Sequence, residues 1–231
     1  TSFSISDSST DHTFNFKDTS SKTDSVAFSL SNYTGGADTE LIIPGIETLT
    51  ITSAGGTNSN VFDLIAAAAK TLTIKGTGGF DIDATNLSTA GSTKITTIDA
   101  SAASGNVAIA TGALASGTTD ITVTGGSGND TLDASAHVAN DSSVSGGAGN
   151  DTIVVALSVD DTVDGGTGTD MLSTTTVISE AGNITNFETL RLTANVSQDM
   201  DFLSGNTITK VVSGDNGAGV GFTDASADVV T

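Results

Sequence analysis

Apolar residues alternate with Thr or Ser in short segments that recur along most of this chain. The clearest segments are TLTI at 48–51, TLTI at 71–74, TTID at 96–99 and DITV at 120–123. Their starts lie 23, 25 and 24 residues apart, and the rhythm continues with irregular steps at 142–147, 161–166, 189–193 and 209–213. Strict alternation of this kind is typical of a β-strand with one buried face.

A period of 20–25 residues with one strand per step predicts a solenoid, in which each coil buries its apolar row against the next. We therefore expect an all-β fold, a right-handed parallel β-solenoid of about ten coils. An antiparallel sandwich with evenly spaced strands is the alternative, although hairpin dipeptides between the segments are scarce. The segment VFDLIAAAAK at 61–70, behind Asn60 as a cap, is the one helix that the sequence predicts.

A longer duplication overlies the short repeat. TDSVAFSLS at 23–31 leads to GIETLTITS at 45–53, and TDMLSTTTV at 169–177 leads to NFETLRLTA at 186–194. We expect one continuous solenoid domain over residues 1–231, with an architectural restart near residue 165.

Three glycine-aspartate nonapeptides stand within this pattern, at 125–133, 146–154 and 165–173, and each fits GGxGxDxUx with U a large apolar residue. Glycine permits positive-φ turns that aim backbone carbonyls outward, and the Asp adds a carboxylate beside them. Oxygen ligands of this mixed kind suit a hard cation such as calcium. The candidate metal ligands are Gly125, Gly126, Ser127, Gly128, Asp130, Gly146, Gly147, Ala148, Gly149, Asp151, Gly165, Gly166, Thr167, Gly168 and Asp170.

The spacing of the three turns places them on neighbouring coils. Two nonapeptides make about one 18-residue coil, so the turns should stack along one edge, about 4.8 Å apart. Neighbouring carboxylates would then repel by about 0.9 kcal/mol in water and about 3.5 kcal/mol at an effective dielectric of 20. A divalent ion between adjacent turns reverses that sign, so we expect at least two calcium ions within a segment at about 120–175.

Composition narrows the possible partners. The formal charge is −20, from 27 acidic and 7 basic side chains, and 23 of the acids are Asp. Nucleic acid is excluded as a partner because phosphate contacts need clustered Lys and Arg. Cysteine is absent, so an extracellular chain would need a stabiliser other than disulfides. No signal peptide and no apolar run long enough for membrane insertion occurs, and the abrupt start and stop suggest a fragment.

Other acidic and glycine-rich segments are weaker candidates. Asp83, Asp99 and Asp133 stand in DAT or DAS triplets, where capping of a turn competes with an extended ion ladder. The segments 34–41, 76–83 and 213–219 contain Gly and Asp but break the GGxGxD order, so a plain turn is favoured there. The two histidines, His12 and His137, form no catalytic constellation, and no nucleophile motif occurs. We expect no catalytic residues and no enzymatic activity.

The nonapeptides GGSGNDTLD, GGAGNDTIV and GGTGTDMLS resemble the RTX repeats of type I-secreted Gram-negative proteins. Together with GIETLTITS, KTLTIKG, TTIDASAASGN and NFETLRLTA they are similar to RTX-containing bacterial surface-layer proteins, over roughly residues 22–230. The resemblance implies a secreted, calcium-bound solenoid that tiles the cell surface in a two-dimensional lattice. It places the ligands on the turn backbones at 125–128, 146–149 and 165–168 and on the three Asp residues.

The resemblance also implies the partners: other copies of the chain in a calcium-dependent lattice, and cell-surface polysaccharide through regions outside this fragment. The exposed acids that we expect to bridge copies are Asp160, Asp161, Asp199 and Asp201. A module of a large RTX adhesin that binds glycan or a host ligand is the main alternative. A solenoid polysaccharide lyase or epimerase is a third possibility.

Overall fold

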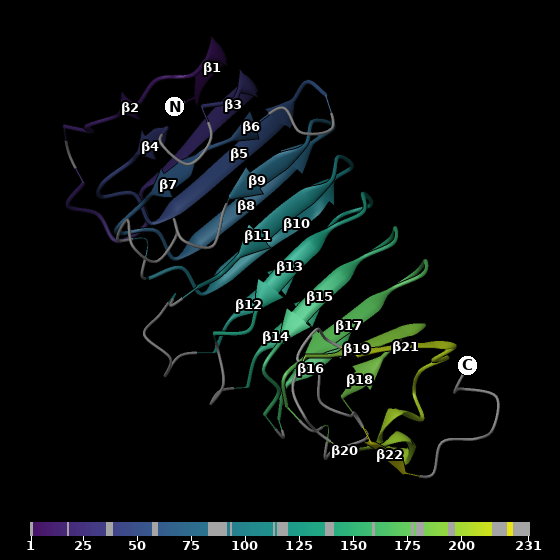
Figure 1. Ribbon diagram of the computed structural model, residues 1–231. Helices are drawn as coiled ribbons and strands as arrows, with labels where there is room; N and C mark the ends of the chain where they lie inside the picture. Colours follow the sequence, from purple (N-terminus) through teal and green to yellow (C-terminus); the bar gives the residue numbers. More distant parts are fainter. Residues whose placement is uncertain are drawn as a thin grey trace.

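Parallel strands stack coil upon coil into a β-solenoid of about eight turns (Figure 1). The computed structural model describes residues 2–17, 19–35, 39–56, 60–82, 92, 94–112, 114, 120–136, 141–158, 160–176, 178, 183–193, 197–213 and 221–223. The all-β parallel solenoid predicted from the sequence is confirmed. The number of coils is smaller than the predicted ten because segments such as 189–193 follow an earlier strand on the same coil.

Most coils contribute one strand to each of two long rows, in which every strand pairs in parallel with its neighbours. The first row contains β1 (Ser2–Ser8), β3 (Ser25–Tyr33), β5 (Thr48–Ala54), β8 (Thr71–Gly76), β10 (Thr97–Ala103), β12 (Thr122–Thr124), β14 (Ser143–Ser145), β16 (Thr162–Asp164) and β18 (Ile184–Thr185). The second contains β6 (Asn60–Val61), β9 (Phe80–Ile82), β11 (Val107–Ala110), β13 (Thr131–Ala134), β15 (Thr152–Val155), β17 (Met171–Thr174), β19 (Thr189–Leu192) and β21 (Lys210–Ser213).

Two shorter groups of parallel strands complete the described fold. Near the N-terminus β2 (His12–Thr13), β4 (Glu40–Ile42) and β7 (Asp63–Ile65) form a third face. Near the C-terminus β20 (Ser197–Asp199) pairs with β22 (Gly221–Thr223), and a short 3₁₀ helix follows at Met200–Leu203.

Register explains the alternation seen in the sequence. In the first row the inward positions align Val26, Leu49, Leu72, Ile98, Val123, Val144, Val163 and Ile184. In the second row they align Ile82, Ile109, Leu132, Ile153, Leu172 and Leu190. All of these side chains are buried in one continuous core. Each contributes roughly 1.5–3 kcal/mol on burial, while Thr is the commonest residue at the outward positions between them.

The helix predicted at 61–70 is wrong. The segment enters strands β6 and β7, and the side chains of Phe62 and Leu64 are buried at alternate positions. Asn60 does not cap a helix: its side chain accepts a hydrogen bond from the N–H of Tyr33 at 3.0 Å and donates to Ser53 Oγ at 2.7 Å. Pairing of β6 and β7 with neighbouring coils therefore overrides the helical pattern over 60–65. The alanines that follow form a turn, in which the N–H of Ala69 donates to the carbonyl of Ala66 at 3.0 Å.

The longer duplication has a shared hydrogen-bond pattern. The N–H of Asp24 donates to Glu47 Oε2 at 3.1 Å, and the N–H of Asp170 donates to Glu188 Oε2 at 2.8 Å. In the first copy these acids precede strands of the first row, and in the second copy they precede strands of the second row. The restart predicted near residue 165 stays a prediction.

Candidate cation-binding edge

The three glycine turns stack along one edge of the solenoid, where they join the first row of strands to the second (Figure 1). The N–H of Ala148 donates to the carbonyl of Gly126, and the N–H of Thr167 to the carbonyl of Gly147, both at 2.9 Å. Equivalent positions of successive turns are thus bonded directly. The stacking predicted from the spacing is confirmed.

Glycine is required in these turns mainly because successive backbones touch. A Cβ on Gly147 would overlap the carbonyl oxygen of Gly126, and a Cβ on Gly168 would overlap that of Gly149. Positive φ angles occur at Gly147 and Gly149 and at the equivalent Gly166 and Gly168.

The first turn departs from the sequence prediction. Gly125, Gly126 and Gly128 do not have positive φ angles. Close approach of the neighbouring coil explains their identity, since a Cβ on Gly126 would overlap the carbonyl oxygen of Ala103.

The aspartates of the three turns form a hydrogen-bonded ladder with the backbone. Asp130 Oδ1 accepts from the N–H of Val107 at 2.8 Å. Asp151 Oδ1 accepts from the N–H of Asp130, and Asp170 Oδ1 accepts from the N–H of Asp151, both at 2.7 Å. Each of the three aspartates is only 1% exposed. The carboxylates are therefore buried between coils.

The second carboxylate oxygens differ along the ladder. Asp130 Oδ2 accepts from the N–H of Gly126 at 2.6 Å. Asp151 Oδ2 and Asp170 Oδ2 are buried and have no hydrogen-bond partner in the structure. A buried polar atom without a partner costs about 1–3 kcal/mol, and more when it is charged. These two oxygens need a positively charged partner or a proton.

A backbone carbonyl lies close to the unpartnered oxygen of Asp151. A Cβ placed on Gly146 would overlap both Asp151 Oδ2 and the carbonyl oxygen of Gly165. Absence of that Cβ therefore lets one carboxylate oxygen and one carbonyl oxygen from successive turns approach the backbone of Gly146 together. Such hard oxygen donors are the ligands that calcium prefers. The residues present thus fit a calcium ion.

Electrostatics at the ladder agrees with this geometry. Desolvation by burial, with the charge of Asp130, raises the pKa of Asp151 from 3.8 to about 6. Desolvation, followed by the charges of Asp151, Glu188 and Asp164, raises the pKa of Asp170 to about 6. Burial also raises the pKa of Asp130, against the opposing hydrogen bonds from Gly126 and Val107. The folded chain without cations therefore disfavours the ionised ladder.

A second ladder of side-chain amides, which was not predicted from the sequence, runs beside the first. Asn106 Oδ1 accepts from the N–H of Asn129 at 2.9 Å. Asn129 Oδ1 accepts from Asn150, and Asn150 Oδ1 from Thr169, both at 2.8 Å. The shared signal is Gly-Asn at 105–106, 128–129 and 149–150. It shows that the turn at 103–106 belongs to the same edge, with Val107 at the aspartate position.

The acidic ladder also extends past the last nonapeptide, to Glu188. There a turn of three residues, 186–188, takes the place of the six at 165–170. Asn186 has a φ of 61°, and a Cβ on Gly165 would overlap its carbonyl oxygen. The signal in the sequence is an acid directly before an alternating strand, as in ETL and DTI.

The weaker candidates behave as turns. Asp99 Oδ1 and Asp133 Oδ1 accept from the N–H groups of Ser101 and Ser135 at 3.0 and 2.9 Å, which confirms capping for these two. Hydrogen bonds from Ser101 lower the pKa of Asp99. Asp83 and His137 lie outside the described residues, as do parts of the segments 34–41, 76–83 and 213–219.

The prediction that Asp161 bridges copies of the chain is wrong. Asp161 is 5% exposed, and its carboxylate accepts from the N–H groups of Ser142 at 2.8 Å and Ser158 at 2.6 Å. It ties two coils together at the edge opposite the glycine turns, so it is unavailable to a partner. Asp160 and Asp201 are exposed, and Asp199 is half-buried at the start of the 3₁₀ helix.

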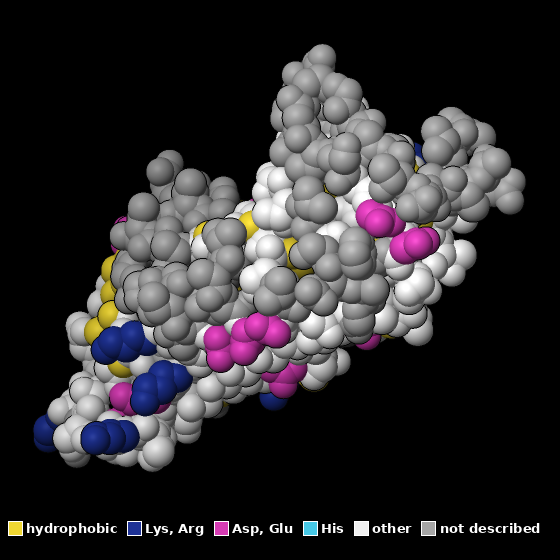
Figure 2. Space-filling view, turned by 90° about the horizontal axis from the view of Figure 1, so that it is seen from below, with side chains coloured by type: hydrophobic (Ala, Val, Ile, Leu, Met, Phe, Trp, Pro, Cys, Tyr) yellow, Lys and Arg dark blue, Asp and Glu magenta, His cyan; other side chains and the backbone are white. Residues whose placement is uncertain are grey.

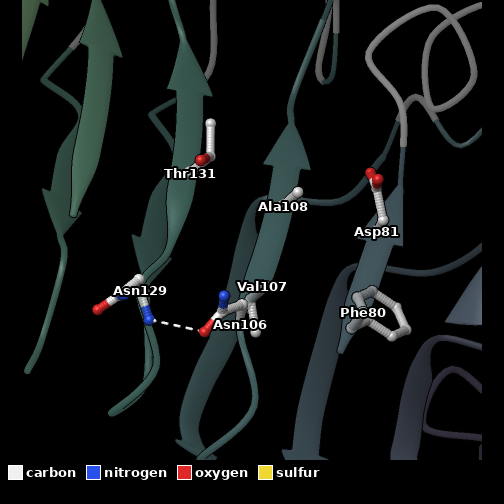
Figure 3. A pocket seen from close by; sticks show the side chains of 7 residues that line it. All are labelled: Phe80, Asp81, Asn106, Val107, Ala108, Asn129 and Thr131. Atoms are coloured by element: carbon white, nitrogen blue, oxygen red, sulfur yellow. Dashed lines mark hydrogen bonds between the residues drawn. The ribbon is translucent and has the colours of Figure 1, made fainter. Parts of the chain in front are cut away.

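A shallow hollow of about 150 Å³ lies on the outer face of the second row (Figure 3). It forms because the small Ala108 stands in register between Asp81 and Thr131, with Asn106 and Asn129 at its rim. It is smaller than the roughly 300–1,000 Å³ of typical ligand pockets. It offers one carboxylate and no pair of acids for hydrolytic chemistry.

In the described ranges no three His, Cys, Asp or Glu side chains converge as a metal-binding group. A cation at the glycine edge would therefore depend on backbone carbonyls as well as carboxylates. Those same ranges contain no helix long and apolar enough to cross a membrane. No protein-family model, curated protein or solved structure matches the chain.

The stacked glycines lead to a first prediction. Gly147→Ala should destabilise the fold by about 2 kcal/mol or more, because φ is +99° and the added Cβ overlaps Gly126. Thermal unfolding should show a melting temperature lower by about 4 °C or more. Gly56→Ala is the matched control, since a Cβ there meets nothing within 4 Å. Equal effects of the two substitutions would contradict the close stacking.

The raised pKa values lead to a second prediction, for protein kept free of metal by a chelator. Between pH 3.8 and about 6 the folded state binds more protons at Asp151 and Asp170 than the unfolded state does. Stability therefore falls as pH rises through this window, and the full penalty remains above it. The melting temperature at about pH 5 should exceed that at about pH 7.5. A melting temperature that rises with pH over this range would contradict the buried, unpartnered ladder.

Proposed function

We propose that this chain is a structural module of a bacterial surface layer, a calcium-stabilised solenoid that is secreted and assembles with copies of itself. The observation that carries the proposal is the pair of buried, unpartnered carboxylate oxygens on Asp151 and Asp170. Burial of such atoms costs free energy unless a cation or a proton binds to them. At neutral pH a cation is the better partner, because both pKa values lie near 6.

The donor set favours calcium among the common metal ions. The ligands that we propose are turn carbonyls at 146–149 and 165–168 and the carboxylates of Asp151 and Asp170, with at least two ions along the edge. Asp130, expected from the sequence as a third carboxylate ligand, accepts from two backbone N–H groups with its two oxygens. Calcium takes six to eight oxygens in flexible geometry, whereas zinc prefers Cys and His. Cys is absent, and only two His residues occur in the sequence.

A structural role is favoured over an enzymatic one by the kind of residues at the edge. The acids of the ladder are buried and bonded to backbone, so they cannot reach a substrate. Their contribution is to join coils. The resemblance of the nonapeptides and Thr-rich strands to RTX surface-layer proteins supplies the Gram-negative cell surface and type I secretion as parts of this proposal.

Charge favours assembly controlled by divalent ions. Residues 1–94 contain five basic and ten acidic side chains, and residues 95–231 contain two basic and 17 acidic ones. On the face shown in Figure 2, most of the visible Lys and Arg side chains gather at one end, whereas most of the Asp and Glu side chains lie along the middle and toward the other end. Like-charged segments of two copies repel within about 8 Å at physiological ionic strength. Divalent bridging between acidic stretches removes that repulsion.

A row of exposed acids is suited to such bridging. The register of β12, β14 and β16 aligns Asp120, Asp141 and Asp160 on successive coils, and all three are exposed. Partial desolvation, with the charges of Asp160 and Asp120, raises the pKa of Asp141. This row lies at the edge opposite the glycine turns, so ions there would act between copies.

Calcium should drive folding of the segment at about 120–175. Its strands are only three or four residues long, and without cations two carboxylate oxygens of the ladder have no partner. Binding to the folded state alone adds about 2.7 kcal/mol when free calcium is 100 times the Kd. Circular dichroism and thermal melting in calcium and in excess chelator test this, with magnesium at matched ionic strength as control. An unchanged sheet signal together with an unchanged melting temperature would refute it.

Calcium should also trigger ordered assembly. Light scattering and electron microscopy of the chain should detect sheets at millimolar calcium and none in sodium chloride of the same ionic strength, because screening alone does not bridge carboxylates. The triple variant Asp120→Asn, Asp141→Asn, Asp160→Asn should fold with calcium yet need more of it to assemble. Assembly in sodium alone to the same extent would show that screening suffices.

A further inference from the structure

The last carboxylate of the glycine edge faces a turn that carries no glycine motif. Asp170 belongs to the third nonapeptide, and the next coil passes it through the short turn at 186–188. Asp170 Oδ2 is buried without a partner, and the residue as a whole is 1% exposed. This oxygen therefore needs a positive partner as much as Asp151 Oδ2 does.

The surroundings of Asp170 repeat those of Asp151. A Cβ on Gly146 would overlap the carbonyl oxygen of Gly165, and a Cβ on Gly165 would overlap that of Asn186. At both glycines the first carbonyl of the next turn thus lies close to the aspartate side chain of the same turn, Asp151 beside Gly146 and Asp170 beside Gly165. Asn186 supplies that carbonyl because its φ of 61° gives it a left-handed backbone.

Glu188 adds a second carboxylate at this position. Its Oε2 accepts from the N–H of Asp170 at 2.8 Å, as the aspartates do on earlier coils. The turn is fixed by Asp164, whose Oδ1 accepts from Asn186 Nδ2 at 2.7 Å and from the N–H of Gly166 at 3.1 Å. The side chains of Asp170 and Glu188 and the carbonyl of Asn186 thus lie together between the third glycine turn and the turn at 186–188.

The opposite end of the ladder is satisfied by the protein itself. Asp130 uses one oxygen for the N–H of Val107 and the other for the N–H of Gly126. No unpartnered carboxylate oxygen therefore anchors an ion between the first and second nonapeptides. The carboxylate oxygens that lack a partner therefore lie toward the C-terminal end of the edge, on Asp151 and Asp170.

We propose that a calcium site lies between the third glycine turn and the turn at 186–188, held by Asp170, Glu188 and the carbonyl of Asn186. This inference rests on the proposed cation-binding function and extends it to residues outside the GGxGxD motif. The ions of the edge are then anchored by Asp151 and Asp170, one coil further along the chain than the nonapeptides alone predict.

Two single variants distinguish this site from an arrangement in which the ions lie only between the three nonapeptides. Glu188→Gln keeps an oxygen for the N–H of Asp170 and removes one charge, whereas Asp130→Asn removes one charge at the other end. Asp7→Asn, at an exposed acid of β1, is the control for net charge. The probe is calcium chloride added to chelator-treated protein, with bound ions counted by equilibrium dialysis.

Glu188→Gln should bind one calcium ion fewer than the natural chain, or fill that site only at about ten-fold or more higher calcium. Asp130→Asn and Asp7→Asn should bind the natural number. Melting gives a second readout. In chelator Glu188→Gln should be at least as stable as the natural chain, because a like charge beside Asp170 is gone, whereas in calcium it should be less stable.

The outcomes distinguish failure of the proposed calcium-binding function from failure of this one site. If the natural chain binds no calcium, the proposed function fails and this site fails with it. If the natural chain binds calcium but Asp130→Asn loses an ion and Glu188→Gln does not, only this site is overturned. Equal destabilisation of Glu188→Gln in chelator and in calcium would assign Glu188 a structural role and also overturn the site.

Discussion

A hydrogen bond from the backbone of one coil to a buried carboxylate of the next is the interaction on which this edge depends. Strands β3 and β5, near the N-terminus, are nine and seven residues long. Along the glycine turns the strands shrink to three or four residues. As backbone pairing shortens, the ladder through Asp130, Asp151, Asp170 and Glu188 holds successive coils in register.

In such a ladder the turns must bury carboxylates and also hold them close to one another, although like charges repel. Carboxylates that bond to the coil before them must be buried, and burial brings them close to one another at a spacing of about 4.8 Å. Glycine allows the backbones to approach this closely, and the same approach directs carbonyl oxygens toward the carboxylates. Every additional coil therefore adds negative charge and electron-rich oxygen to one narrow strip. The acids, the glycines and the need for a cation therefore all follow from the close stacking of successive turns.

Much of the fold could be predicted from the sequence because the strands obey a simple period. Alternation marks Leu49 and Leu72 as inward residues, and the solenoid follows from their spacing. Where local propensity and the pairing of coils disagree, prediction failed. The alanine run near residue 66 favours a helix by propensity, but strand pairing on both sides of Phe62 decides otherwise.

The site was predictable in its residues but not in its bonds. The nonapeptides mark Asp151 and Asp170, yet the N–H that each receives comes from a residue about 20 positions away, which only register identifies. The turn at 103–106 escaped notice because it lacks paired glycines and an acid. Glu188 escaped because its turn is three residues shorter. Asp161 was misjudged as exposed because charge alone does not reveal whether two backbone N–H groups enclose a carboxylate.

The ladder is also directional, since every carboxylate accepts from the coil that precedes it. A partly formed stack therefore has two chemically different fronts. At the front nearer the C-terminus it presents a bare N–H, which water satisfies easily. At the front nearer the N-terminus it presents a bare carboxylate, which repels the next acidic coil until a cation covers it. The ionic composition of the medium thus acts unequally on the two ends of a growing stack, and it can select the end from which the solenoid winds.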